Sequence, residues 1–250
     1  MIEATRLESE GRRLVEEAAA QSLVVRLLGG MAFWMRADDR GRSLLGREYK
    51  DLDFAAIRAQ SGALRRLMEA SGYVPERQFN AIHGAKRLLY YPADGAFQMD
   101  IFLSNFSMCH ELKLADRLEI EPLTLPAAEL LLTKLQIVEL NSKDVADVLM
   151  MLLEHHLADT DGAKLINAKR IVQLCCADWG LYTTVNDNLA RIGEQTSALL
   201  AEGADSVQIL GTLTELRQRL ETAPKSLGWR ARARVGRTVR WYELPEEVAR

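Results

Sequence analysis

The stretch LLGGMAFWMR at residues 27–36, followed by YKDLDF at residues 49–54, decides how this chain begins to fold. The residues just before Gly29 are mostly apolar and include β-branched side chains, which is typical of a buried strand running into a tight turn. MAFWMR after the two glycines suits a helical turn. An apolar segment that carries Asp51 and Asp53 follows. The pattern predicts a strand, a glycine turn, a helical turn and a second strand.

Helix and strand patterns alternate on both sides of this stretch. Apolar residues at helical spacing predict a helix over 3–21, and the polar, glycine-containing residues 37–49 are expected to form a loop. Residues 51–57 predict the second strand, and residues 60–72 predict another helix. KRLLYYP and AFQMDIFLS, on either side of the turn at 92–95, predict a β-hairpin.

The second half of the chain has a different texture. From about Pro126 onward, apolar residues recur at helical spacing with almost no strand signal. The segment EPLTLP at residues 121–126 places two prolines between the two patterns. We therefore expect an α+β fold, with a mixed sheet flanked by helices in residues 1–125 and a helical domain in residues 126–250.

The composition is that of a folded globular protein with little net charge. The 250 residues are 48% hydrophobic, and the formal net charge of −3 excludes a global basic field that would attract nucleic acid. The first residues lack a signal-peptide pattern, and no apolar run approaches the ~18 residues of a membrane span. Cysteines are few, and two of them are adjacent. These features predict a cytoplasmic protein with no membrane association.

Three aspartates are candidate metal ligands. Asp51 and Asp53 should project to the same side of their strand, with Cα atoms ~6.5–7 Å apart, while Leu52 turns into the core. Carboxylates so placed repel each other unless a cation lies between them, and oxygen ligands suit Mg²⁺ or Mn²⁺, which orient substrate phosphates. Asp100 is a lone acid in an otherwise apolar strand. If that strand lies beside the strand of Asp51, a third carboxylate joins the pair.

Gly29 and Gly30 are candidate phosphate-binding residues. A Gly-Gly turn that opens a helix lets the backbone approach a triphosphate closely and directs free N–H groups toward it. The same turn is also common without any ligand, and Asp-Leu-Asp at a strand start is also compatible with a cap or a solvated edge. The glycines and the acids in this order together favour a nucleotide site.

Gly29-Gly30, then Asp51-Leu52-Asp53, then Asp100 in an apolar strand resembles the signature of the nucleotidyltransferases of the DNA polymerase β superfamily. The resemblance implies a polymerase-β-like domain in which the two glycines seat the triphosphate. It also implies that Asp51, Asp53 and Asp100 bind Mg²⁺ or Mn²⁺, with Asp100 helping to activate the acceptor hydroxyl. The interval between the glycines and the aspartates is longer than usual, so 37–49 would be an insertion beside the site. Its arginines, at 40, 42 and 47, either contact substrate or are solvated.

The second half of the chain extends this resemblance. LLLTKL, with Lys134, and NSKDVADVL, with Lys143, Asp144 and Asp147, resemble the lysine and Lys-Asp elements of the AbiE-type toxin nucleotidyltransferases, so the likeness covers roughly residues 22–155. It implies that Lys134 contacts a phosphate and that Asp144 belongs to the site. Alternatively, Lys134 extends from an apolar helix face to water, and the acids occupy a helix first turn, where the dipole favours them.

The segment KSLGWRARARVGRTVRW, residues 225–241, is basic and contains no acid. Leu227, Val235 and Val239 recur at helical spacing, which predicts an amphipathic helix docked by that stripe, with the arginines outward. The Arg230–Arg240 strip is then either a solvated face or the place where an RNA backbone binds.

The sequence therefore predicts a metal-dependent nucleotidyltransferase. It would bind an NTP with Mg²⁺ and transfer the nucleoside monophosphate to an acceptor that the sequence does not identify, RNA being one candidate. Two alternatives remain. One is a degenerate nucleotide-binding or interaction module of the same fold, and the other is a nucleotide-sugar glycosyltransferase that uses the Asp-x-Asp pair.

Overall fold

The computed structural model describes residues 4–244. These residues divide into two compact units. The first unit contains residues 4–36, 47–106 and 112–126; the second contains residues 37–46, 107–111 and 127–244. Both helices and strands are present, so the predicted α+β class is confirmed.

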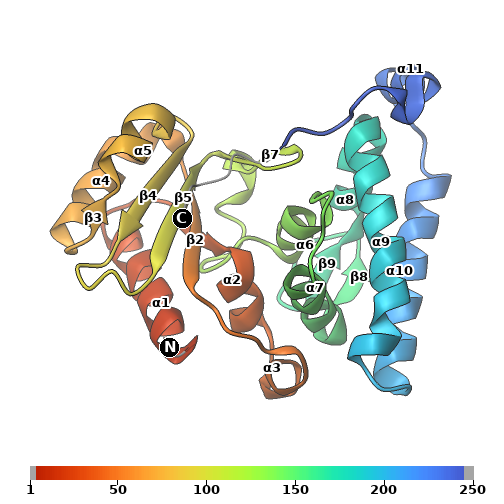
Figure 1. Cartoon of the computed structure of the whole chain (residues 1–250), viewed down its shortest axis with the longest axis horizontal. Helices are drawn as coiled ribbons and strands as arrows, with labels where there is room; N and C mark the ends of the chain where they lie inside the picture. The colour runs from red at the N-terminus through yellow and green to blue at the C-terminus, as the bar shows by residue number, and fades with distance from the viewer. Residues whose placement is uncertain (1–3, 245–250) are drawn as a thin grey trace. The chain divides into compact units, whose positions relative to one another are not determined.

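The first unit is built on a five-stranded mixed sheet, with the strands in the order β1-β2-β5-β4-β3. Strands β2 and β5 are parallel, and the other neighbouring pairs are antiparallel, including the predicted β4–β5 hairpin. Figure 1 shows β4, β5 and β2 side by side. The strands are β1 (Val25–Leu28), β2 (Asp51–Ala56), β3 (Val74–Pro75), β4 (Arg87–Tyr91) and β5 (Gln98–Leu103).

One face of this sheet forms the core of the first unit. Phe54 and Ile101 point to the same small apolar cavity as Leu14 of one helix and Leu64 of another. Because side chains alternate along a strand, the acids next to Phe54 and Ile101 in sequence fall on the opposite face. The helices of the unit are α1 (Ala4–Ala20), α2 (Gly29–Arg36), η1 (Arg58–Gln60), α4 (Ser61–Ala70), α5 (Arg77–His83) and η2 (Ala115–Arg117). A short ribbon is formed by β6 (Asn105–Ser107) and β7 (Glu111–Lys113).

The predicted elements of the first half form, with one exception. The helix expected over 3–21 is α1; residue 3 lies outside the described residues. The loop expected over 37–49 is wrong, because this segment contains α3 (Asp39–Leu45). The Asp38 side chain accepts a hydrogen bond from the Gly41 backbone N–H, which caps the new helix. This single cap, followed by the buried Leu45, outweighs the polar composition that favoured a loop.

The second unit is mostly helical. It also contains a pair of short parallel strands, which the helical pattern did not predict. Within residues 4–244 no helix is long and apolar enough to cross a membrane. The further elements are α6 (Ala127–Leu135), α7 (Ser142–Glu154), β8 (His156–Ala158), β9 (Leu165–Asn167), α8 (Ala168–Ala177), α9 (Trp179–Leu199), α10 (Ala204–Thr222), α11 (Leu227–Val235) and η3 (Gly236–Thr238).

Candidate functional site

The candidate site lies on one face of the sheet of the first unit, where the end of β1 meets the first halves of β2 and β5. The end of β1 pairs with the start of β2, so that Leu28 lies opposite Asp53. The start of β5 lies on the other side of β2, with Asp100 in register with Asp53. The strand of Asp100 therefore lies beside the strand of Asp51, which was the condition for a third carboxylate to join the pair. Since Asp51 and Asp53 alternate with Leu52, the three acids lie on one face, opposite the face that packs on α1 and α4.

Gly29 is required by its contact with Asp53. Its φ is +67°, in the left-handed region that favours glycine. A Cβ at this position would stand 1.9 Å from Oδ2 of Asp53, so any larger residue would displace that carboxylate. Gly29 therefore lets the start of α2 lie directly against an acid of the candidate site.

Gly30 lies against a different pair of side chains. A Cβ here would lie 2.4 Å from Nη2 of Arg47 and 3.0 Å from the ring of Tyr49. The Arg47 guanidinium in turn covers the Tyr49 ring, at 4.4 Å from its centroid. Of the three arginines that the sequence left open, Arg47 thus lies beside the glycine turn, whereas Arg40 pairs with Asp205 within the second unit. The predicted contact between the glycines and a triphosphate stays a prediction.

Asp100 is the buried acid of the three, with 3% of its surface exposed. Its Oδ1 accepts a hydrogen bond from Nε of Arg87 at 2.7 Å, and its Oδ2 accepts one from Nε2 of Gln98, also at 2.7 Å. Both oxygens therefore already have donors. The sequence did not point to Arg87, since it lies two positions off the register partner of Asp100 and only the sheet brings the two together.

The donor set fits a divalent cation that arrives with a phosphate ligand. Asp51 is exposed and Asp53 is half-buried, and Mg²⁺ commonly binds one or two carboxylates together with substrate phosphates. Across the described part of the chain, no group of three or more His, Cys, Asp or Glu side chains could hold a metal ion by itself. The role of Asp100 as a metal ligand stays a prediction.

Lys134 and Asp144 meet in the second unit. Nζ of Lys134 lies 2.7 Å from Oδ1 of Asp144 and 3.0 Å from Oδ2 of Asp147. The lysine side chain is only 12% exposed, so the alternative in which it extends to water is wrong. Burial acts to lower the pKa of Lys134, but the carboxylates of Asp147 and Asp144 outweigh it and raise that pKa. The lysine is therefore held as a cation between two buried acids, and its contact with a phosphate stays a prediction.

The basic segment docks differently from the prediction. Leu227 is 83% exposed, and Val235 and Val239 are exposed as well, so the expected apolar stripe does not dock. Instead Trp229 packs against Tyr182 of α9 in a T-shaped arrangement, with ring centroids 5.2 Å apart.

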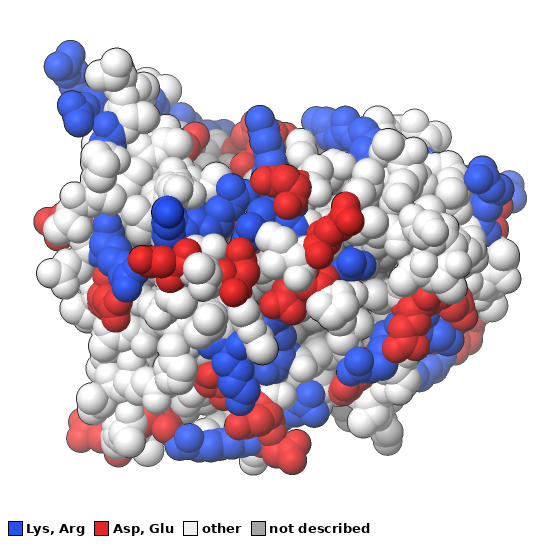
Figure 2. Space-filling view, turned by 180° about the vertical axis from the view of Figure 1, so that it is seen from behind, with Lys and Arg blue, Asp and Glu red and all other residues white. Residues whose placement is uncertain are grey.

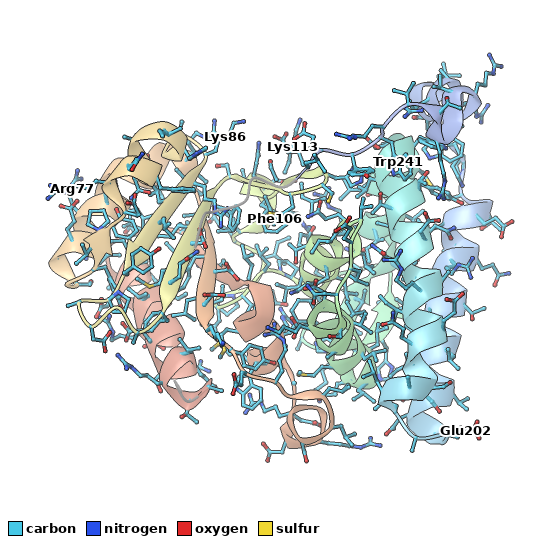
Figure 3. All side chains as sticks on the ribbon, in the orientation of Figure 1. Arg77, Lys86, Phe106, Lys113, Glu202 and Trp241 are labelled. Carbon is cyan, nitrogen blue, oxygen red and sulfur yellow. The ribbon has the colours of Figure 1, made fainter. Side chains whose placement is uncertain are left out.

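A hydrogen bond from Trp241 holds the end of this segment against α9. Figure 3 labels Trp241 beside α9, where its Nε1 donates to Oγ1 of Thr184. Arg230 and Arg234 are exposed, and neither side chain makes a hydrogen bond or ion pair to residues 4–244. Figure 2 shows Lys and Arg side chains at the projecting end that holds α11.

Comparison with known proteins adds no assignment. No protein-family model matches this sequence, and no curated protein matches it either.

Proposed function

We propose that this protein is a metal-dependent nucleotidyltransferase with a polymerase-β-like catalytic unit. The observation that carries the proposal is that Gly29 lies against Asp53, while Asp100 on the neighbouring strand is in register with Asp53. The proposal is supported by the closeness of a glycine turn, which opens α2, to three acids on one face of two neighbouring strands.

The roles of the residues follow from their chemistry. Asp51 and Asp53 would hold Mg²⁺, which supplies positive charge to orient and neutralise the phosphates of an NTP. The backbone at Gly29 and Gly30, at the start of α2, would face the triphosphate. Lys134 and Asp144 belong to the second unit, and the contact of Lys134 with a phosphate that the resemblance implies stays a prediction. The transfer would move a nucleoside monophosphate onto an acceptor hydroxyl and release pyrophosphate.

The test combines binding with transfer. An NTP with Mg²⁺ should raise the melting temperature of the protein, because a ligand that binds only the native state stabilises it. Asp53→Asn should abolish this shift, while Asp116→Asn, an exposed aspartate of the same unit, should leave it unchanged. Incubation with each α-labelled NTP, Mg²⁺ and total RNA or protein should then give a labelled acceptor and free pyrophosphate. An unchanged shift in Asp53→Asn would exclude the assigned site.

A second candidate function is nucleotide binding without transfer. The hydrogen bonds of Arg87 and Gln98 to both oxygens of Asp100 favour it, because they leave this acid less able to bind a cation. This candidate gives the same thermal shift but no pyrophosphate with any acceptor. A nucleotide-sugar glycosyltransferase would instead release a nucleoside diphosphate from a labelled nucleotide sugar.

A further inference from the structure

Arg87 is held rigidly on the face of the sheet that carries the acids. Its Nε donates to Asp100, and its guanidinium carbon lies 4.9 Å from the ring centroid of Phe102 and 5.5 Å from that of Phe79. The ion pair fixes one edge of the guanidinium, and the two rings contact its planar surface. A flexible surface arginine has no such fixed orientation.

A chain of hydrogen bonds supports this arrangement. The Tyr91 hydroxyl lies 3.5 Å from Oε1 of Gln98, and Gln98 donates in turn to Asp100. Burial raises the pKa of Tyr91, and the nearby Asp100, Glu76 and Asp51 raise it further, so the hydroxyl keeps its proton and can donate. Asp100 is thereby oriented from one side by Gln98 and from the other by Arg87.

The guanidinium keeps most of its donors for another partner. Arginine has five N–H donors, and Nε–H is the one that Arg87 uses. Its two terminal amino groups make no hydrogen bond to any residue from 4 to 244, although the side chain is only 18% exposed. A guanidinium in this state matches the paired oxygens of a phosphate.

We propose that Arg87 binds a phosphate of the nucleotide through its terminal amino groups, with Asp100 and Gln98 as positioning residues. The inference deepens the proposed function, on which its choice of ligand rests. In this arrangement Arg87 supplies the positive charge beside Asp100 that a second metal ion would otherwise supply. Asp51 and Asp53 are then left as the acids for one metal ion, and Asp100 acts on the phosphate through Arg87.

The test measures the affinity of the whole protein for inorganic triphosphate in Mg²⁺ by calorimetry. Arg87→Lys keeps a positive charge near Asp100 but loses the planar fork, and Arg87→Gln with Asp100→Asn removes both charges so that no buried acid is left unpaired. Each should bind triphosphate about 10- to 100-fold more weakly, the loss expected for hydrogen bonds to a charged group. Arg66→Gln, an exposed arginine on α4, is the matched control and should bind as the unmodified protein does.

The positioning role has its own readout. Asp100→Asn alone should weaken triphosphate binding, and it should have no further effect once Arg87 is Gln, because Asp100 acts only through that arginine. If the losses of triphosphate affinity in Asp100→Asn and Arg87→Gln instead multiply in the double variant, the positioning role of Asp100 is overturned.

The inference fails if the unmodified protein does not bind triphosphate, or if both Arg87 variants bind it normally while keeping their melting temperature. Failure of the proposed function looks different: triphosphate binds through Arg87, yet no labelled NMP is transferred.

Discussion

Gly29 and Asp53 are in such close contact that the α-carbon of the glycine has no room for a side chain. A Cβ on residue 29 would lie 1.9 Å from Oδ2 of Asp53. The sequence motif joins these two residues by their order alone, 24 positions apart in the numbering. In the folded protein the antiparallel pairing of β1 with β2 makes them neighbours, with Leu28 opposite Asp53.

Gly29→Ala should therefore destabilise the protein more than the same substitution at another glycine that also has a positive φ. Gly95 also has a positive φ, of +63°, but no atom lies within 4 Å of the Cβ it would gain. Gly95→Ala should cost only the left-handed strain of about 1–2 kcal/mol, whereas Gly29→Ala adds an overpacking cost of about 1–3 kcal/mol. Urea unfolding of both variants checks this. Equal losses would contradict the contact with Asp53.

Lys134→Met should be strongly destabilising whether or not the protein transfers nucleotides. It would leave Asp147, which has no exposed surface, and Asp144 without their cation, at a cost of about 3–5 kcal/mol. Lys143→Met, at an exposed position on the next helix, should change stability by less than about 0.5 kcal/mol.

Denaturant unfolding of these variants is the measurement. Adding Asp144→Asn and Asp147→Asn to Lys134→Met should recover much of the loss, since no buried charge then remains unpaired. A Lys134→Met variant as stable as Lys143→Met would refute the buried triad.

Glu154→Gln should change how stability depends on pH. Burial raises the pKa of Glu154, and its side-chain hydrogen bond with Asp38 adds to this, although the Asp38 backbone N–H opposes it. A raised carboxyl pKa in the folded state contributes stability below the unfolded value, about 4.3, and loses it as pH rises through the folded value. Glutamine stays neutral and can still donate to Asp38.

The variant should accordingly gain about a degree or two in melting temperature relative to the unmodified protein near pH 8, and less near pH 4. Lys164 does not reverse this expectation, because it lies 3.9 Å from Glu154 and is largely exposed. Glu139→Gln, an exposed glutamate of the same unit, is the control. A difference from the unmodified protein that is constant across pH would contradict a raised pKa of Glu154 in the folded state.

If the acceptor is RNA, the exposed arginines of α11 should contribute to its binding. Arg230→Gln with Arg234→Gln should lower the slope of log affinity against log salt by about 1.4, since each phosphate contact to a single strand adds ~0.7. Arg237→Gln should change the slope less, because Arg237 already pairs with Asp187 at 2.8 Å. Salt titrations by filter binding measure both slopes. RNA binding that is absent at low salt, or insensitive to the double change, would leave α11 as a solvated helix.

Much of the local structure was predictable because it depends on nearest neighbours in the chain. The apolar runs that end at Gly29 and begin at Asp51 form strands, and the turn at 92–95 closes the β4–β5 hairpin. Asp100 could also be singled out from local sequence, because it is the one acid in the apolar segment QMDIF. A charge in an apolar strand violates the period-two pattern and therefore signals a special position.

Prediction from the local sequence pattern was wrong where a single tertiary or capping contact outweighed the composition of a segment. The composition of residues 37–49 predicts a loop, but the cap that Asp38 provides starts α3 there. The apolar residues of the basic tail were expected to dock, yet Trp229 and Arg232 make the contacts, because the rings of α9 that receive them lie some fifty residues earlier in the chain. Composition carries no information about such partners.

The sequence by itself determined which residues carry the chemistry of the candidate site: a glycine pair, an Asp-x-Asp pair and one further acid, in a fixed order. Only the tertiary structure decided which partners the side chains have. In the folded protein Arg87 pairs with Asp100, Arg47 lies against Gly30, and Lys134 is buried between two acids. The reason is physical: covalent order fixes side-chain type and alternation, whereas the pairing of a charge is set by strand register and helix packing between segments distant in the chain.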